Sequence, residues 1–132
     1  MVESAQSSVI VKRSHMSVAD TVDRVKHVIA DRGFTLFRVI DHSGQAEQAG
    51  VHMPDSKLVM FGKPAVGASA MVATPSAGLD LPLKILVSED AHGVVSVSYN
   101  SPDFLAERHQ LNGALRAPFD AVASIVEAVV SP

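Results

Sequence analysis

The sequence predicts an α+β fold: a two-layer sandwich in which a mixed sheet of about five strands packs against helices. The length of 132 residues fits one domain with a core of its own. Hydrophobic residues make up 47% of the chain and the formal net charge is only -3, a balance typical of globular proteins. Strand and helix patterns alternate at first, and the chain then ends with a hairpin and helices. No repeat or low-complexity linker divides the chain, so we expect a single domain over residues 1–132.

The composition also restricts the function. The chain has no cysteine, which excludes disulfides, thiolate catalysis and cysteine-ligated metals. It has no basic excess and few aromatic residues, which argues against nucleic-acid binding. The most apolar stretch, "LVMFGKPAVGASAMVA", is interrupted by Lys63 and Pro64 and is too short to span a bilayer, and the N-terminus lacks the apolar region of a signal peptide. We therefore expect a cytoplasmic protein with no membrane partner.

The first two elements are a strand and an amphipathic helix. Residues 9–12 form the strand. Ser17 is a typical N-cap, Asp20 is favourable in the first helical turn, and Gly33 can end the helix in the left-handed conformation. Apolar residues recur at helical spacing and predict one buried stripe: Val18, Val22, Val25 and Ile29.

The next elements are two strands separated by a short helix. "FTLFRVID" and "KLVMFG" carry apolar residues on both faces, which predicts two interior strands. Between them, "SGQAEQAG" predicts a helix with Ser43 as N-cap and Gly50 as its end. Pro64 then begins a helix of small residues that runs to about Thr74.

"LPLKILVSEDAHGVVSVSYN" predicts a hairpin whose register can be argued. A two-residue loop would place the apolar side chains of its first strand opposite serines. A three-residue loop, with Asp90 opening a type I turn and Gly93 in the left-handed conformation, pairs Ile85 with Tyr99 and Val87 with Val97. We expect the second register, because it makes one face apolar throughout. The opposite face is then polar apart from Leu86, with Lys84, Ser88, Ser96, Ser98 and Asn100.

Two helices close the chain, beginning at Pro102 and Pro118. The last helix carries an apolar stripe made of Phe119, Val122, Val126, Val129 and Val130. Ala121, Ile125 and Ala128 lie outside this stripe, and a two-layer fold also leaves one sheet face uncovered. Something should cover such apolar surface, so we expect a homodimer.

Together, "FRVIDHSGQAEQAG", "LVMFGKPAVGASAM", "LDLPLKILVSEDAHGVVSVSYNSP" and "LAERH" resemble the bacterial domain of unknown function 302 family over about residues 15–111. The resemblance implies an α+β fold similar to the TATA-binding-protein-like arrangement, often a dimer, and no established activity. Two residues depart from the family pattern: Lys63 replaces a usual asparagine and Ser88 a usual large aromatic residue, so a pocket or contact surface should differ here. The matching positions are Asp41, His42, Phe61, Gly62, Pro64, Gly67, Met71, Asp80, Pro82, Tyr99, Asn100, Pro102, Arg108 and His109.

Arg108 and His109 are the main candidates for a functional site. A helix from Pro102 would place Arg108 on the inward face, with His109 at its edge, lining a cleft beside Tyr99 and Asn100. A buried arginine needs a carboxylate, and Asp80 is the most natural partner, with Asp41 as the other. The pair then either fixes the helix or presents a guanidinium group to an anionic ligand. Asp80 itself is either a loop carboxylate that accepts backbone N–H groups or a desolvated acid–base group.

The leading functional prediction is a non-catalytic domain that binds a small ligand or regulates. One alternative is a small enzyme that uses Asp80 and His109 as acid and base, with Arg108 holding an anionic substrate. Another is a purely structural dimerisation domain. The sequence has no nucleophile elbow or P-loop, and a Ser101–His109–Asp80 triad rests on no motif. No pair among His42, His52 and His109 has metal-motif spacing, so we expect no metal and no cofactor. The candidate ligand-binding residues are Asp80, Tyr99, Asn100, Arg108, His109 and His42.

Overall fold

A computed structural model describes residues 7–132. Residues 1–6, the beginning of the N-terminal segment in which we expect no signal peptide, lie outside this range. The strands are β1 (Val9–Ser14), β2 (Thr35–Asp41), β3 (Ser56–Gly62), β4 (Leu83–Glu89) and β5 (Val95–Asn100). The helices are α1 (Val18–Asp31), α2 (His42–Gln48), α3 (Pro64–Ala73), α4 (Pro102–His109) and α5 (Ala117–Val130), with the 3₁₀ helices η2 (Pro75–Leu79) and η3 (Gly113–Leu115).

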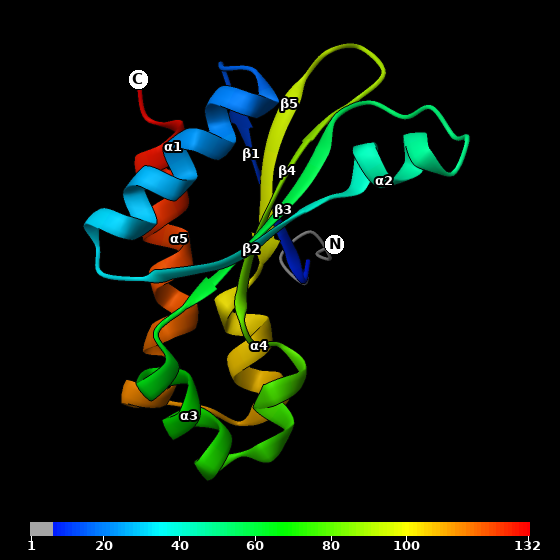
Figure 1. Cartoon of the computed structure of the whole chain (residues 1–132). Coiled ribbons are helices and arrows are strands. Elements are labelled where there is room, and N and C mark those ends of the chain that lie inside the picture. Colours follow the sequence, from blue (N-terminus) through cyan, green and yellow to red (C-terminus); the bar gives the residue numbers. More distant parts are fainter. Residues whose placement is uncertain (1–6) are drawn as a thin grey trace.

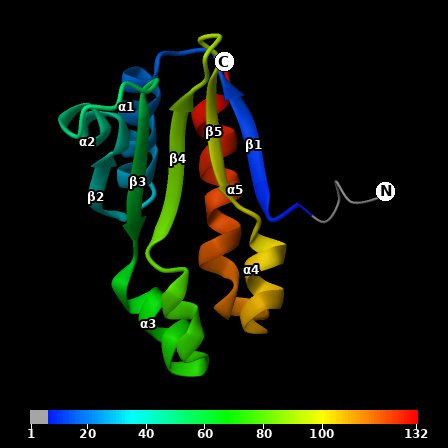
Figure 2. The ribbon, with the colours of Figure 1, turned by 90° about the vertical axis from the view of Figure 1, so that its right-hand side faces the viewer.

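The five strands form one open sheet in the order β1-β5-β4-β3-β2, with every neighbouring pair antiparallel (Figure 2). The α+β two-layer prediction is confirmed, but the expected mixed sheet is wrong. A mixed sheet would need β1 and β2, which are joined by α1, to be paired neighbours in the sheet. Four successive antiparallel pairings make β1 and β2 run in the same direction, yet the two strands form opposite edges of the sheet and never pair.

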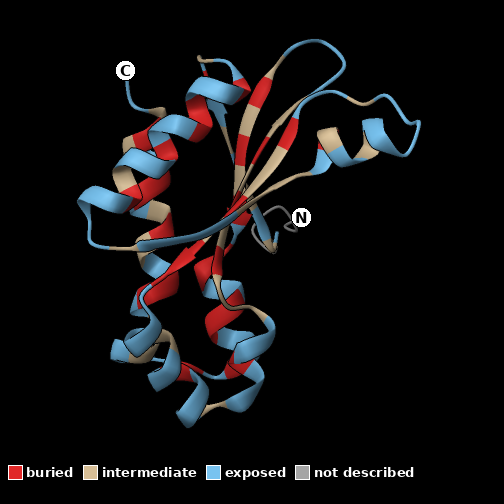
Figure 3. Cartoon of the chain, viewed as in Figure 1, coloured by how far each residue is buried: buried red, intermediate tan, exposed pale blue. Residues whose placement is uncertain are grey.

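Helices α1 and α5 cover one face of the sheet, and the core lies between them and the strands (Figures 1 and 3). The N-cap at Ser17 is confirmed, because its side chain accepts the Asp20 backbone N–H, and all four residues of the predicted α1 stripe are buried. Ile125 in α5 is also fully buried at 0% exposure. It therefore belongs to the core, and the expectation that it lies on a free apolar surface is wrong.

Strand β2 is an edge strand and not the predicted interior one. Although its sequence is apolar on both faces, only part of the strand packs against the core. Val39 packs there, whereas Leu36 and Phe37 are 41% and 47% exposed, next to a bulge in the pairing with β3. The N-cap of α2 is likewise Asp41 and not Ser43, because the Asp41 carboxylate accepts the Gly44 N–H at 2.9 Å.

The predicted hairpin turn and its register are confirmed. Val87 lies opposite Val97, and the Asp90 N–H donates to the Val94 carbonyl at 2.9 Å across a three-residue loop. Gly93 has a φ of 81°, in the left-handed region. The serine-rich side of β4 and β5 faces away from α1 and α5. In the described part of the chain no helix covers β1, β5 and β4 on that side (Figure 2).

Helices α3, η2 and α4 gather at one end of the sheet, while α2 lies toward the other end (Figures 1 and 2). Within residues 7–132 no helix combines the length and apolar character needed to cross a bilayer. The α3–η2–α4 end of the molecule contains both a partly buried polar cluster and an apolar cavity.

Candidate functional site

A polar cluster joins η2, the turn after it and α4. Oδ2 of Asp80 lies 2.5 Å from Nε2 of His109 and 3.3 Å from Nη1 of Arg108. On the other side of the ring, Nδ1 of His109 lies 2.8 Å from Oγ of Ser76. The Asp80 carboxylate thus contacts the side chains of two consecutive residues of α4, and His109 connects it to Ser76. The predicted contact between Arg108 and Asp80 is confirmed.

The orientation of α4 differs from the prediction. Ser101 caps the helix by accepting the Phe104 N–H, and Gln110 ends it with a left-handed φ of 54°. The buried face carries Leu105, Ala106 and His109, so the His109 side chain is 1% exposed while that of Arg108 is 47% exposed. The placement of Arg108 inward and of His109 at a cleft is therefore wrong. A flexible arginine can reach Asp80 from the rim, whereas the shorter imidazole must be buried to do so.

The hydrogen-bond partners define the histidine tautomer. An ionised carboxylate only accepts hydrogen bonds, so Nε2 of His109 carries the proton that faces Asp80. In the neutral ring, Nδ1 then accepts the hydroxyl proton of Ser76. Sequence reasoning missed Ser76 and considered Ser101 instead, which is occupied as the N-cap of α4. The available signal was the spacing in "SAGLD", which brings a serine close to Asp80 through one short helical turn.

The remaining predicted residues are not brought to this cluster in the way expected. Tyr99 is 6% exposed and faces the core, where burial raises the pKa of its hydroxyl, with Glu127 adding to the effect. Asn100 shares a depression of about 10 Å³ with Asp80 and Lys84, which is room for a single water. His42 is exposed at the start of α2, toward the opposite end of the sheet (Figure 1).

Lys84 is a further charged group beside Asp80, whereas Asp41 lies at the start of α2, away from this cluster. Lys84 donates to the Pro82 carbonyl at 3.0 Å, and burial lowers the pKa of its ammonium group while the nearby Asp80 charge opposes that shift. Asp41, the other proposed partner of Arg108, instead pairs with Lys57 at 2.8 Å. No three histidine, aspartate or glutamate side chains come together as a metal-binding group within the described residues.

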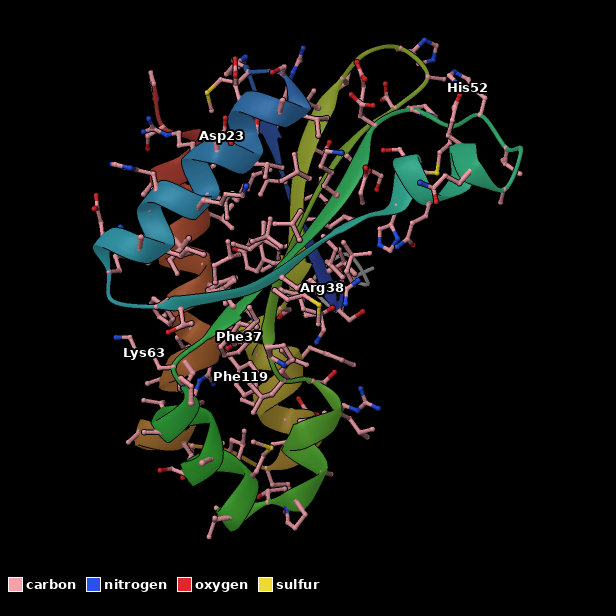
Figure 4. The ribbon with its side chains drawn as sticks, viewed as in Figure 1. Asp23, Phe37, Arg38, His52, Lys63 and Phe119 are labelled. Carbon is pink, nitrogen blue, oxygen red and sulfur yellow. The ribbon has the colours of Figure 1, made fainter. Side chains whose placement is uncertain are left out.

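The second feature is an apolar cavity of about 470 Å³ between α3, the start of β2, the end of β3, the start of β4 and the start of α5. Its walls include Phe37, Val66, Met71, Leu81, Pro118 and Ala121. Phe37, Val66 and Met71 are each at least 39% exposed, although apolar side chains of this size are normally buried. In Figure 4, Phe37 and Lys63 lie at the end of the sheet that meets α3, far from His52 beyond α2.

Lys63 is the charged residue in the wall of this cavity. Its Nζ lies 4.5 Å from the centroid of the Phe34 ring, which is a cation–π contact. Within the described part of the chain, Lys63 forms no salt bridge with a carboxylate. The cavity and the polar cluster share one segment, because Leu81 and Pro82 in the cavity wall directly follow Asp80.

These features define a small α+β domain of the open two-layer class with a ligand-sized cavity beside its sheet. Residues 10–129 match the model of the family "Domain of unknown function DUF302", and the chain belongs to that family. The family resemblance predicted from the sequence is therefore confirmed. A crystal structure of an uncharacterized conserved DUF302 protein from Bacillus stearothermophilus has a similar fold, with a TM-score of 0.76 and 14% identity. That similarity covers 93% of this chain and 95% of the other.

Two Brucella proteins are similar in sequence. A fluoride-specific ion channel FluC 1 from Brucella suis biovar 1 (strain 1330) is 37% identical over 105 residues, covering 80% of this chain and 41% of the relative. A FluC 1 protein from Brucella abortus biovar 1 (strain 9-941) is also 37% identical over 105 residues, covering 39% of its length. The chain thus spans well under half the length of these relatives.

Proposed function

We propose that this domain binds a small amphiphilic molecule, with an apolar chain or ring inside the cavity and a negatively charged end at Lys63. The observation that carries the proposal is the cavity of about 470 Å³ with an apolar lining and a single lysine. Binding sites for small molecules typically measure roughly 300–1,000 Å³ and combine apolar walls with a few polar groups that fix orientation.

The exposure of the walls supports the same proposal. Phe37 is 47% exposed and Val66 and Met71 are each 39% exposed, so water contacts apolar surface at the cavity. An apolar ligand would remove this surface from water and would gain about 0.8 kcal/mol for each methylene that it buries. The free energy of binding should therefore depend mainly on the length of the apolar part.

The charge of Lys63 gives the expected sign of the ligand. A lysine that has no carboxylate partner in the described structure can pair with a carboxylate, sulfate or phosphate group at the cavity mouth. Because Lys63 is exposed, such a pair should contribute only about 0.5–1 kcal/mol. The lysine thus selects among ligands that the apolar walls already hold.

Isothermal titration with hexanoate, octanoate and decanoate tests the proposal. Each added methylene should tighten binding about fourfold until the cavity is filled. Ala121→Leu, which places a larger side chain into the cavity, should weaken binding strongly. Ala68→Leu adds the same group at an exposed position of α3 that is absent from the cavity wall, and it should leave binding unchanged.

Lys63→Met separates the charge from the apolar contacts. This variant should weaken decanoate binding by about two- to fivefold and leave decanol binding unchanged. Absence of binding for the whole series, or an affinity that does not depend on chain length, would refute the proposal.

The Brucella relatives suggest the setting in which such binding acts. They are named fluoride-specific ion channels, and most of each protein lies outside the segment similar to this chain. We propose that the domain acts in the cytoplasm by sensing a small molecule, and that the matched segment of such relatives regulates the rest of their chain in this way. Fluoride efflux from vesicles that contain the Brucella suis protein should then change on addition of decanoate. It should not change in vesicles whose protein lacks the matched segment, which controls for direct effects on the lipid.

A further inference from the structure

The hydrogen-bonded chain Ser76–His109–Asp80 has a chemical capacity that binding in the cavity does not use. We propose that Ser76 is a nucleophile that accepts acyl groups from carboxylic esters, with His109 as its general base. Asp80 and Arg108 are positioning residues, because they act on the reaction only through His109. The proposal rests on the polar cluster alone and does not depend on the ligand of the cavity.

The arrangement of protons supports this role. The Asp80 carboxylate, 2.5 Å from Nε2 of His109, keeps the ring proton on that nitrogen, which leaves the lone pair of Nδ1 directed at the Ser76 hydroxyl at 2.8 Å. The ring presents its nitrogens in the opposite order to a serine-protease triad, but either imidazole nitrogen can accept the proton. Arg108 makes a second contact with the same oxygen, because its Nη1 lies 3.3 Å from Oδ2 of Asp80.

Accessibility distinguishes the serine from the histidine. The His109 side chain is 1% exposed, whereas Ser76 lies on the surface, so a substrate can meet the nucleophile while the base stays shielded from water. Val72 in α3 and Leu79 in η2 are 85% and 70% exposed, and α3 packs against η2. These apolar side chains on the same part of the surface favour an ester with an apolar acyl group.

The reaction balances without a further reactant except water. Oγ of Ser76 forms a bond to the ester carbonyl carbon as its proton passes to Nδ1 of His109. The bond to the leaving oxygen then breaks, and the alcohol departs with that proton. Water, deprotonated in the same way, cleaves the acyl–serine bond and restores the hydroxyl. An alkyl fluorophosphonate should trap the nucleophile covalently. In that reaction Oγ of Ser76 forms a bond to phosphorus, and fluoride leaves with the electron pair of the P–F bond.

Labelling of the full chain with an alkyl fluorophosphonate, followed by peptide mass mapping, tests the proposal. Ser76 should be labelled at least about 100-fold faster than Ser69, an exposed serine whose hydroxyl donates to the Ala65 carbonyl instead of to a histidine. Ser76→Ala should remove the adduct, and Ser69→Ala should leave it unchanged.

The role of the base is tested by His109→Gln, with folding checked by circular dichroism. This variant should lower the rate of Ser76 labelling by about 100-fold or more. If it does not fold, the comparison between Ser76 and Ser69 in the unmodified chain still decides the matter. Equal labelling of the two serines, or no adduct at Ser76, would overturn the proposal and leave the cluster with a structural role.

Discussion

Asp80 and His109 lie 29 positions apart in the sequence, and their side chains meet at 2.5 Å. Asp80 is 13% exposed and His109 is 1% exposed, so this contact is shielded from water and joins α4 to the segment that enters β4. The same segment forms part of the cavity wall through Leu81. The contact thus fixes the geometry of the whole α3–η2–α4 end of the molecule.

The first prediction compares the two consecutive side chains that bind Asp80. His109→Ala should lower the free energy of unfolding by about 2–4 kcal/mol, because it leaves a shielded carboxylate and Ser76 without their partner. Arg108→Ala should cost only about 0–1 kcal/mol, because the arginine side chain is 47% exposed and solvent screens its charge. Urea unfolding of both variants measures the difference, and a larger cost for Arg108→Ala would contradict it.

The second prediction uses two glycines in helices. Gly67→Ala should stabilise the domain by about 0.5–1 kcal/mol, because its Cβ would lie 3.7 Å from Leu81 Cδ1 in ordinary contact and α3 would gain helix propensity. Gly44→Ala should instead cost about 1–2 kcal/mol, since its Cβ would lie 2.2 Å from Oδ2 of Asp41 and displace the α2 N-cap. Thermal unfolding should rank the variants in this order, and stabilisation by Gly44→Ala would be the contrary result.

The third prediction concerns acid stability. The hydrogen bond from Lys57, aided by the Gly44 N–H, holds the pKa of Asp41 below its usual value of 3.8. A lowered pKa contributes stability that is fully present above pH 3.8 and is lost as the pH falls through the folded-state value. At neutral pH the native chain should therefore have a higher melting temperature than the Asp41→Asn variant. This difference in melting temperature should disappear as the pH falls below 3.8. A gap that is independent of pH would show that the charge of Asp41 is not involved.

The fourth prediction is a homodimer formed through the uncovered sheet face. The strand register places Val11 and Leu86 on this face, each opposite Ser98. Val11 is 58% exposed and Leu86 is half-buried. Pairing of two such faces would remove this apolar surface from water. Light scattering should give about twice the chain mass, and Leu86→Lys should shift it toward 13.9 kDa. A mass of 13.9 kDa for the unmodified chain would contradict the dimer.

Local patterns in the sequence predicted most of the fold. The α1 stripe, the Ser17 cap and the hairpin turn each follow from spacing within a few residues, and the structure has all three. The position of β2 at the sheet edge could not be predicted in this way. Apolar residues on both faces are typical of an interior strand, but in β2 Phe37 lines the cavity and Leu36 is 41% exposed.

Asp80, Arg108 and His109 of the polar cluster were predicted from the sequence, but Ser76 and the orientation of α4 were not. The charge argument paired Arg108 with Asp80, and the contact is present at 3.3 Å. Its premise of a buried arginine is wrong, because the Arg108 side chain is 47% exposed. Assigning which of two adjacent residues is buried required the angle of α4 relative to the core, which depends on distant packing. The cavity was not predicted either, since its walls come from four separate segments of the chain.

The five methionines allow a direct test of ligand binding inside the cavity. Met71 lines the cavity, whereas Met60 lies on β3 and Met53 in the segment before it. Carbon-13 labelling of the methionine methyl groups gives a separate NMR signal for each. Titration with decanoate should shift the Met71 signal progressively and leave the Met53 and Met60 signals in place. A shift of the Met60 signal without that of Met71, or no shift at all, would show that decanoate does not bind in the cavity.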